Sequence, residues 1–372
     1  MTIMKIDEVS LTIFTWPGIP ATRYTSGSQT AGGSSTLGLL RIHTDQGPEG
    51  HAFLGTATNP ATMDGPQLIR SLKPMLLGQD PLERERLHQA MRLQSRNVSY
   101  RVIGAVDVAL WDLAGKIAGL PIHALMGTHR TAIAAYASSQ VLPDIAAYVD
   151  QAQAFQAQGW QAYKIHPPRD PATDIKVCAA VRKAVGDDYR LMLDSTWSYT
   201  YPDALRVGRA IEELGYYWYE DPLADEDIYN YVKLRQKLDI PILATEYPAG
   251  GLDTYPIWLT ERATDYLRGD IPNKGGLTPM LKTAHLAEAF GLNYEIHHSG
   301  NSLNNLGNLH LCMAIRNTTM FEVLLPHAAH KYGMAGELEI DAAGMLAAPT
   351  GPGLGAAIDF DLIAARTESL LR

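Results

Sequence analysis

The amino-acid sequence predicts an α/β protein in which an N-terminal α+β domain precedes a (β/α)8 barrel. The chain has 372 residues, 46% of them hydrophobic, which is enough to build one large domain and a smaller one. From Ala132 onward, short apolar segments alternate with helical patterns of roughly 12 to 15 residues, as repeated βα units do. Ionisable residues follow those apolar segments at a nearly constant interval.

The N-terminal region begins with strand patterns. Leu39 to Thr44 and Glu49 to Leu54 flank the turn residues Asp45-Gln46-Gly47, which predicts a hairpin within a β-meander. Pro17 to Ser35 is rich in Gly, Ser and Thr and has few apolar residues, so we expect a mobile surface loop there.

Helical periodicity then extends from about Thr62 to Gly119, where Gly119 and Pro121 end it. The first third of the chain therefore predicts an α+β domain. After Pro326 the chain becomes rich in Gly and Ala, and we expect it to run back over this domain. The predicted units are an N-terminal α+β capping domain at 1-128, the barrel at 129-330 and a returning C-terminal segment at 331-372.

The predicted barrel strands end at regular positions. The intervals from Asp194 to Glu322 are 26, 26, 24, 27 and 25 residues, which is regular enough to indicate a repeat. Eight parallel strands of this kind would close into a TIM-type barrel that opens at one mouth, where such barrels place their active sites. The candidate strand ends are Ser138, Lys164, Asp194, Glu220, Glu246, Asp270, His297 and Glu322.

Three carboxylates end consecutive predicted strands. Asp194, Glu220 and Glu246 follow the third, fourth and fifth apolar segments, so they would converge at the mouth. Close together they would repel one another unless one is protonated or a cation neutralises them. Oxygen-only ligation favours Mg²⁺, with Mn²⁺ as a substitute. Alternatively these acids cap helices or pair with neighbouring bases, which one acid would fit more easily than three at a fixed period.

Bases flank this predicted metal site on two sides. Lys164 and His166 have the i, i+2 spacing that places both on one face of a strand, where the lysine would balance a substrate carboxylate and the imidazole would accept a proton. A core or helix-capping role also explains His166. Asp270 and His297 end the sixth and seventh strands, so the carboxylate would fix the tautomer of the imidazole. Because strand neighbours alternate, we expect His297 rather than His298 to face the mouth.

Glu322 follows Met320-Phe321 on the eighth predicted strand. In its protonated form it would contact the substrate carboxylate, and the alternative is a surface glutamate. Lys164 and a metal would also lie around that carboxylate.

Longer motifs extend this interpretation over essentially the whole chain. They are the helix Ala105 to Lys116 continuing to Gly119, Pro121, Leu125 and Gly127; Glu220-Asp221-Pro222 after the fourth strand; and Asp270 followed by Gly275-Gly276-Leu277-Thr278. They resemble motifs of the enolase superfamily and, within it, of the mandelate racemase/muconate lactonizing enzyme group. Many members of the racemase-like branch carry Lys-x-Lys on the second barrel strand, where this chain has Lys164-x-His166.

The resemblance implies a barrel modified as in that superfamily, a Lys or His base that removes the α-proton of a carboxylate substrate, and one or two Mg²⁺ ions that stabilise the resulting ene-diolate. The metal, Lys164 and Glu322 around the carboxylate would stabilise charge where it develops. It also implies that loops of the capping domain close over the barrel and select the substrate. Here these loops are Pro17 to Ser35 and about Leu54 to Met63.

We expect dehydration of an acid sugar to a 2-keto-3-deoxy acid, because hydrogen-bonding side chains are dense in the first of these loops. Racemisation, epimerisation and cycloisomerisation share the same intermediate and remain alternatives. A metal-dependent amidohydrolase would need His-x-His on the first strand, where Tyr136-Ala137-Ser138 stands, and a non-catalytic barrel would not need bases on both faces. The polar loop residues are Thr22, Arg23, Tyr24, Thr25, Ser26, Ser28, Gln29 and Thr30.

The composition of the chain limits the classes of partner that it could bind. The net charge of -9 and the absence of a Lys/Arg run argue against nucleic acid. No stretch approaches the roughly 18 apolar residues of a membrane span, and Lys5, Asp7 and Glu8 interrupt any secretory signal. Cys178 and Cys312 lie in apolar helical patterns, which predicts buried free thiols. We therefore expect a cytoplasmic homo-oligomer that acts on a small-molecule carboxylate.

Overall fold

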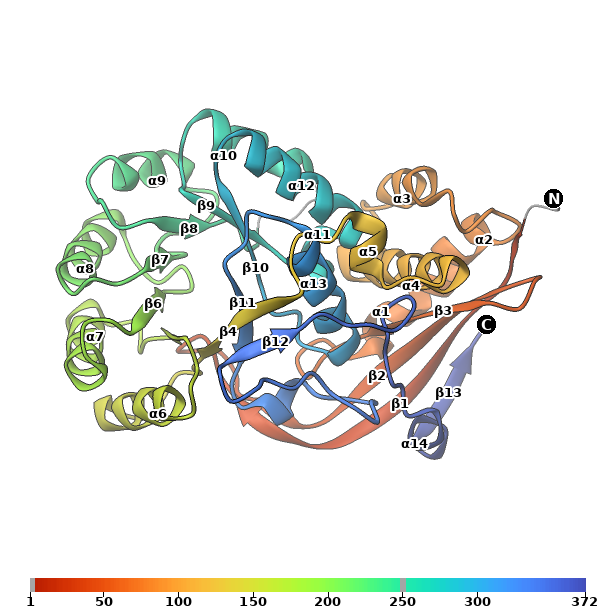
Figure 1. Ribbon diagram of the computed structural model, residues 1–372, viewed down its shortest axis with the longest axis horizontal. Helices are drawn as coiled ribbons and strands as arrows, with labels where there is room; N and C mark the ends of the chain where they lie inside the picture. The colour runs from red at the N-terminus through yellow and green to blue at the C-terminus, as the bar shows by residue number, and fades with distance from the viewer. Residues whose placement is uncertain (1–3, 248–251) are drawn as a thin grey trace.

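A computed structural model describes residues 4–247 and 252–372, which fold into a barrel with a smaller domain beside it (Figure 1). The predicted (β/α)8 barrel with an N-terminal α+β cap is confirmed. Cys178 and Cys312 are both buried and free. Within these described ranges, no helix is long and apolar enough to cross a membrane.

The capping domain is built on an antiparallel sheet whose strand order is β13-β1-β2-β3. Apolar residues of its strands, such as Leu11 and Leu39, are buried in the core, and helix α4 packs against β3. The strands are β1 (Ile6–Thr22), β2 (Ala31–Thr44), β3 (Glu49–Leu54) and β13 (Thr367–Leu371).

The expectation of a mobile loop from Pro17 to Ser35 is wrong. The strands β1 and β2 stay paired through most of this segment, as far as Thr22 opposite Ala31. Backbone hydrogen bonds hold the two strands together, and these bonds do not require apolar side chains. Shifts in register, with Gly33 at a φ of 84°, let the hairpin bend. Only the turn between Thr22 and Ala31 lies outside the strands.

Helix α4 forms the centre of the capping domain. Most of its residues are buried because the helix is apolar on nearly all sides. It ends where the sequence predicts, at Gly119, whose left-handed φ of 69° closes the helix. The helices here are α1 (Ala61–Gln67), α2 (Lys73–Leu76), α3 (Arg84–Arg92), α4 (Tyr100–Ala118) and α5 (Ile122–Met126), with a π-helical segment, Leu68–Leu72, after α1.

Eight parallel strands form a nearly closed barrel, in the order β10-β9-β8-β7-β6-β5-β4-β11. An apolar layer fills its interior below the mouth and consists of Tyr136, Ala162, Met192, Trp218, Leu243 and Met320. The strands are β4 (Ala132–Ser138), β5 (Ala162–Ile165), β6 (Arg190–Asp194), β7 (Trp218–Glu220), β8 (Ile242–Ala244), β9 (Tyr266–Gly269), β10 (Asn293–Ile296) and β11 (Met320–Leu324).

Helices follow the barrel strands and lie on the outside of the barrel (Figure 1). Side chains cap several of them, as where Asp144 accepts a hydrogen bond from the N–H of Ala147 at the start of α6. The helices are α6 (Ile145–Ala157), α7 (Pro171–Val185), α8 (Tyr201–Glu213), α9 (Ile228–Arg235), α10 (Pro256–Thr260), α11 (Ile271–Lys274), α12 (Leu277–Ala289) and α13 (Ser302–Ala314), with a short 3-10 helix, Leu252–Thr254, before α10.

The C-terminal segment contacts both parts of the molecule. After the 3-10 helix His327–His330, β12 (Met345–Ala347) pairs antiparallel to barrel strand β4. The chain then continues through α14 (Phe360–Ala365) to β13, which pairs antiparallel to β1 of the capping sheet. The segment thereby ties the barrel to the cap.

Candidate active site

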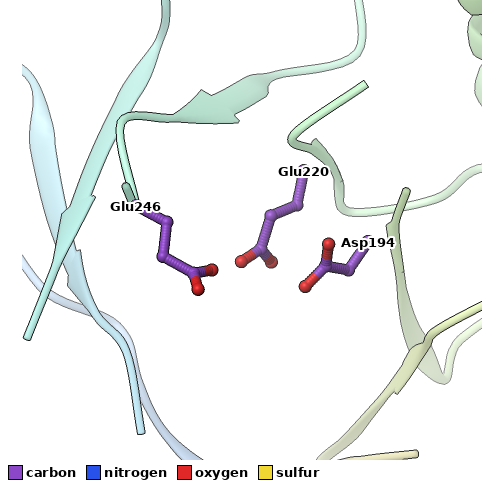
Figure 2. Close-up of side chains that lie close together, drawn as sticks. All are labelled: Asp194, Glu220 and Glu246. Carbon is purple, nitrogen blue, oxygen red and sulfur yellow. The ribbon is translucent and has the colours of Figure 1, made fainter. Parts of the chain in front are cut away.

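The mouth of the barrel carries the three carboxylates that the sequence singles out. Asp194 is the last residue of β6, Glu220 is the last residue of β7, and Glu246 follows shortly after Ala244, which ends β8. All three are buried, and each offers an oxygen within 4.8 Å of those of the other two. Figure 2 shows the side chains directed toward one another, with Glu220 between Asp194 and Glu246. We call these three residues the acidic triad.

Burial and mutual repulsion disfavour the charged forms of two triad members. Burial raises the pKa of Glu246 to about 7, and the carboxylates of Asp194 and Glu220 add to this rise. Burial also raises the pKa of Glu220. Burial opposes the charge of Asp194 as well, but Lys164 and His166 hold its pKa below the ordinary value. A bound cation would favour the ionised form of all three residues.

The excess of negative charge at the mouth equals the charge of one divalent cation. The carboxylates outnumber the fixed cations by two, and the triad offers only oxygen ligands in a buried, close arrangement. These features fit the ligand preference of Mg²⁺. The groups in this balance are the carboxylates of Asp194, Glu220, Glu246 and Glu322 and the cations of Lys164 and Arg268.

Lys164 is engaged with the carboxylates of the protein itself. Its Nζ lies 3.0 Å from Asp194 Oδ2, 2.9 Å from Glu220 Oε2 and 2.7 Å from Glu322 Oε1, and its side chain is 0% exposed. Burial and the nearby Arg268 oppose its charge, yet Glu220 and Glu322 hold the pKa of Lys164 well above the ordinary value. The structure thus places the lysine beneath the mouth, where it balances internal charge. From the sequence, Lys164 was predicted to pair with the carboxylate of a substrate.

Arg268, on β9, is a functional residue that the sequence reasoning missed. Its guanidinium is fully buried, makes ion pairs with Glu220 and Glu322, and lies 3.7 Å from Glu246. These carboxylates hold its pKa well above the ordinary value, although burial opposes the charge. The signal was present in the sequence, because Arg268 stands two residues before Asp270 and therefore on the same face of the strand.

Replacing Arg268 with methionine is expected to destabilise the fold by about 3 to 5 kcal/mol, because Glu220 and Glu322 would lose a buried counterion. Denaturant unfolding in excess Mg²⁺ measures this change. Arg209→Met serves as the control, since Arg209 is an exposed arginine of α8. An Arg268→Met variant as stable as the control would contradict the assigned role.

Glu322 lies in a different environment from the one expected. It is buried on β11, where it receives Lys164, Arg268 and the backbone N–H of His298. Burial opposes its charge, but Arg268 and Lys164 hold its pKa well below the ordinary value. The expected protonated carboxyl is therefore not favoured here, because two cations stabilise the ionised form. Glu322 thereby holds the side chains of Lys164 and Arg268 in place next to the acidic triad.

His166 is oriented toward the mouth by a backbone partner that the sequence could not reveal. Its Nδ1 donates a hydrogen bond to the carbonyl of Ser139 over 2.6 Å. Its Nε2 lies 3.1 Å from Asp194 Oδ2. The tie at Nδ1 fixes the ring and leaves Nε2 as the atom that faces the triad.

His297 is held in the same manner on the other side. Its Nδ1 donates to Asp270 Oδ2 over 2.6 Å, and its Nε2 lies 3.3 Å from Glu246 Oε1. Asp270 is itself fixed, because it accepts a hydrogen bond from the N–H of Asn273 at the start of α11. Burial opposes protonation of His297, but Glu246 and Asp270 outweigh it and raise its pKa to about 9.

His298 is directed away from the triad. Its Nε2 accepts a hydrogen bond from the side chain of Asn305, and its ring packs against that of His330 at 4.9 Å between centroids. Burial lowers the pKa of His298 well below the ordinary value, and the neighbouring His330 adds to this effect. Between the two adjacent histidines, it is His297 that the structure brings to the mouth.

The turn of the capping hairpin reaches the barrel beside His166. Tyr24 donates from its hydroxyl to the carbonyl of Leu325 over 2.8 Å, and its ring lies 5.4 Å from that of His166. Arg169 of the barrel donates to the carbonyl of Ser26 over 3.0 Å. The polar residues at positions 28–30 are exposed. Tyr24 therefore brings a polar group of the cap next to His166.

The second capping loop also contacts the mouth region. Asn301, just before α13, donates from its side-chain amide to the carbonyl of Gly55 over 3.1 Å. The hydroxyl of Ser35 donates to the carbonyl of Thr56 over 2.7 Å, which joins this loop to the capping hairpin. Both predicted capping loops thus form hydrogen bonds with barrel segments.

Comparisons with known proteins agree with this geometry. The family model described as Enolase C-terminal domain-like matches residues 147–362. The model described as Mandelate racemase / muconate lactonizing enzyme, N-terminal domain, matches residues 15–127. Together the two models cover most of the barrel and most of the cap.

Individual relatives match over most of their own length. Arabinonate dehydratase of Saccharolobus solfataricus is 29% identical over 76% of this chain and 78% of its own. D-galactarolactone cycloisomerase of Agrobacterium fabrum is 29% identical over 87% of this chain and 89% of its own. The crystal structure of D-glucarate dehydratase from Agrobacterium tumefaciens complexed with magnesium has a TM-score of 0.90 and 32% identity, covering 99% of this chain and 100% of that one. The chain belongs to the mandelate racemase/muconate lactonizing enzyme group of the enolase superfamily.

Proposed function

We propose that the protein removes the α-proton of an acid sugar and expels the β-hydroxyl as water, which yields a 2-keto-3-deoxy acid. The placement of two imidazoles supports this most directly. Nε2 of His166 lies 3.1 Å from Asp194, and Nε2 of His297 lies 3.3 Å from Glu246. Because these two carboxylates are the outer members of the acidic triad (Figure 2), a carboxylate bound there would have a proton carrier on each side.

Asp194, Glu220 and Glu246 would hold Mg²⁺, and Mn²⁺ is the expected substitute because it also accepts oxygen ligands. When bound, the metal supplies positive charge that stabilises the substrate carboxylate as the α-carbon loses its proton. Lys164 and Arg268 pair with Glu220 and favour its ionised form, against the burial that raises its pKa. They also fix the ligand positions before the substrate arrives, so little reorganisation is needed during the reaction.

His297 is the proposed base. Neutralisation of the Glu246 charge by a bound cation would remove the main contribution that raises the pKa of His297, and would so favour the neutral imidazole. In that form Asp270 holds the proton on Nδ1, so Nε2 can accept the α-proton. The electron pair of the broken C–H bond enters the carboxylate to form an ene-diolate. This pair then forms a double bond between the α- and β-carbons, while the bond from the β-carbon to its hydroxyl breaks. His297, or His166 from the other face, gives the hydroxyl a proton, and water departs. The enol product takes a proton at the β-carbon, gives up the proton of its α-hydroxyl, and becomes the 2-keto-3-deoxy acid.

Cycloisomerisation is the second candidate, since D-galactarolactone cycloisomerase is among the relatives. It uses the same proton abstraction, but the leaving group is a ring oxygen that stays attached to the product. The arabinonate and D-glucarate dehydratases among the relatives favour dehydration. Racemisation or epimerisation would instead return a proton to the α-carbon from the opposite imidazole.

A screen of aldonic and aldaric acids tests the proposal. With Mg²⁺ present, we expect at least one acid to give a 2-keto-3-deoxy product, measured by mass spectrometry as a loss of water. Their lactones and anhydro-sugar acids, screened in parallel, would give a product of unchanged mass if the enzyme is a cycloisomerase. That second result, with no dehydration of any open-chain acid, would overturn the dehydratase proposal and leave the proposed proton abstraction in place.

A further inference from the structure

Glu246 points into the mouth because the chain kinks directly before it. Leu243 lies in the inner apolar layer of the barrel. Regular strand alternation would turn residue 245 inward and residue 246 outward. Instead, Thr245 has a φ of 82°, a left-handed conformation that is unusual for a β-branched residue. The kink shifts the alternation by one residue, so Glu246 joins the acidic triad (Figure 2).

The side chain of Thr245 supplies one restraint on this kink. A residue in a sparsely populated backbone region costs about 1 to 3 kcal/mol and persists only when its surroundings hold it. The Oγ1 atom of Thr245 accepts a hydrogen bond from the backbone N–H of Arg268 over 3.0 Å and donates to the carbonyl of Arg268 over 3.3 Å. The hydroxyl thus bonds to strand β9 with both a donor and an acceptor.

Asp225 supplies a second and independent restraint. Its Oδ1 accepts a hydrogen bond from the N–H of Thr245, and its Oδ2 accepts one from the N–H of Tyr247, each over 3.2 Å. These two peptide groups flank Glu246. Asp225 is only 7% exposed and lies in the loop that follows β7, the strand that ends at Glu220, so its carboxylate links the segments that carry two triad members.

Asp225 does not belong to the acidic triad itself. Among the described residues, the cluster whose carboxylate oxygens all lie within 4.8 Å of one another consists of Asp194, Glu220 and Glu246. The mechanism proposed above leaves Asp225 without a task. Burial opposes the charge of Asp225, whereas the nearby Lys274 and the paired backbone hydrogen bonds favour it, and those hydrogen bonds use both of its oxygens.

We propose that Asp225 is a positioning residue of the metal site: its carboxylate fixes the kink at Thr245 that turns Glu246 toward the metal. This inference rests on the proposed function, because it requires that the triad bind a divalent cation. Groups that orient metal ligands typically contribute 10- to 100-fold to metal affinity. Loss of the Asp225 carboxylate should therefore raise the Kd for Mg²⁺ by about 10- to 100-fold.

Isothermal titration of the full-length protein with Mg²⁺, without substrate, measures this directly. Asp225→Ala removes both acceptors and should show the full weakening. Asp225→Asn keeps one acceptor oxygen and should show a smaller one. Glu226→Gln is the matched control, because Glu226 is exposed on the same loop and its substitution also removes one negative charge. The control should bind Mg²⁺ like wild type.

A second pair of variants tests the kink rather than the charge. Thr245→Ser keeps the hydroxyl that bonds to Arg268, whereas Thr245→Val keeps the side-chain shape and loses it. We expect Thr245→Val to raise the Kd for Mg²⁺ and Thr245→Ser to remain near wild type. At saturating Mg²⁺, kcat of the Asp225 variants should return toward the wild-type value. Circular dichroism without Mg²⁺ should show these variants folded, which separates weak metal binding from general loss of stability, since Mg²⁺ would rescue both.

The possible outcomes separate this inference from the proposed function. No binding of Mg²⁺ by the wild-type protein would overturn the proposed function and the positioning role with it. Equal affinity in wild type, Asp225→Ala and Asp225→Asn would overturn the positioning role alone. Should Asp225→Ala fail to fold, the comparison between Asp225→Asn and Glu226→Gln decides the matter.

Discussion

Replacing His297 with asparagine is expected to lower kcat by about 10²- to 10⁴-fold, the range typical for loss of a positioned general acid or base. Asparagine has a similar shape and its amide can still donate to Asp270, but it cannot carry a proton. The hydrogen bond between His297 and Asp270 is the geometric reason to expect so large an effect. Steady-state kinetics with the acid identified in the screen measure it.

The control for this substitution is His285→Asn, which changes an exposed histidine of α12. It should leave kcat unchanged. Thermal unfolding of both variants should resemble that of wild type, because neither substitution removes a large buried apolar group. A folded His297→Asn variant with a kcat within a few-fold of wild type would show that another group removes the α-proton.

Removing the divalent metal is expected to reduce turnover to background. Without the cation, the three triad carboxylates and Glu322 outnumber the fixed cations Lys164 and Arg268 by two, and the substrate carboxylate would add another negative charge. Dialysis against a chelator followed by titration with Mg²⁺ or Mn²⁺ measures loss and recovery of activity. Full turnover in verified absence of metal would refute the assignment of the triad.

Glu246→Gln gives the same test by mutation. Among the triad members, Glu246 has the fewest close contacts with the fixed cations, since Arg268 lies 3.7 Å away and Lys164 binds the other two. Its substitution should therefore weaken Mg²⁺ binding with little loss of stability. A variant that cannot fold even with excess Mg²⁺ would indicate that Glu246 has a structural role instead.

The barrel and most of the mouth could be predicted from sequence because parallel βα units repeat. The period between Asp194 and Glu322 follows from the similar length of each strand and helix, and the strand ends of such a barrel meet on one side. The same logic placed His297 beside Asp270, since their strands β10 and β9 are hydrogen-bonded neighbours.

Other features depend on contacts between distant segments. The charges around Glu322 could not be predicted without Arg268, because the buried guanidinium pairs with this glutamate, which the sequence placed next to the substrate carboxylate. Strand alternation alone would also have pointed Glu246 outward, since the kink at Thr245 depends on Asp225 in the preceding loop. The partner of His166 is a backbone carbonyl, which no sequence pattern marks.

The capping hairpin shows a related limit. Composition suggested a mobile loop because the segment before Ser35 lacks apolar residues, but backbone pairing between β1 and β2 is nearly independent of composition. Polar side chains in such a segment can pack against the barrel, as Tyr24 does beside His166, or remain in solvent. Their number therefore says less about the substrate than their positions do.

Proton NMR in ²H₂O tests the central claim most directly, with Mg²⁺-loaded wild-type enzyme and the acid found in the screen. The claim is that metal-dependent removal of the α-proton leads to loss of the β-hydroxyl. The predicted result is a 2-keto-3-deoxy product that carries solvent deuterium at the former β-carbon, formed neither without metal nor by His297→Asn. Interconversion of two epimers with deuterium at the α-carbon, and no keto product, would contradict it.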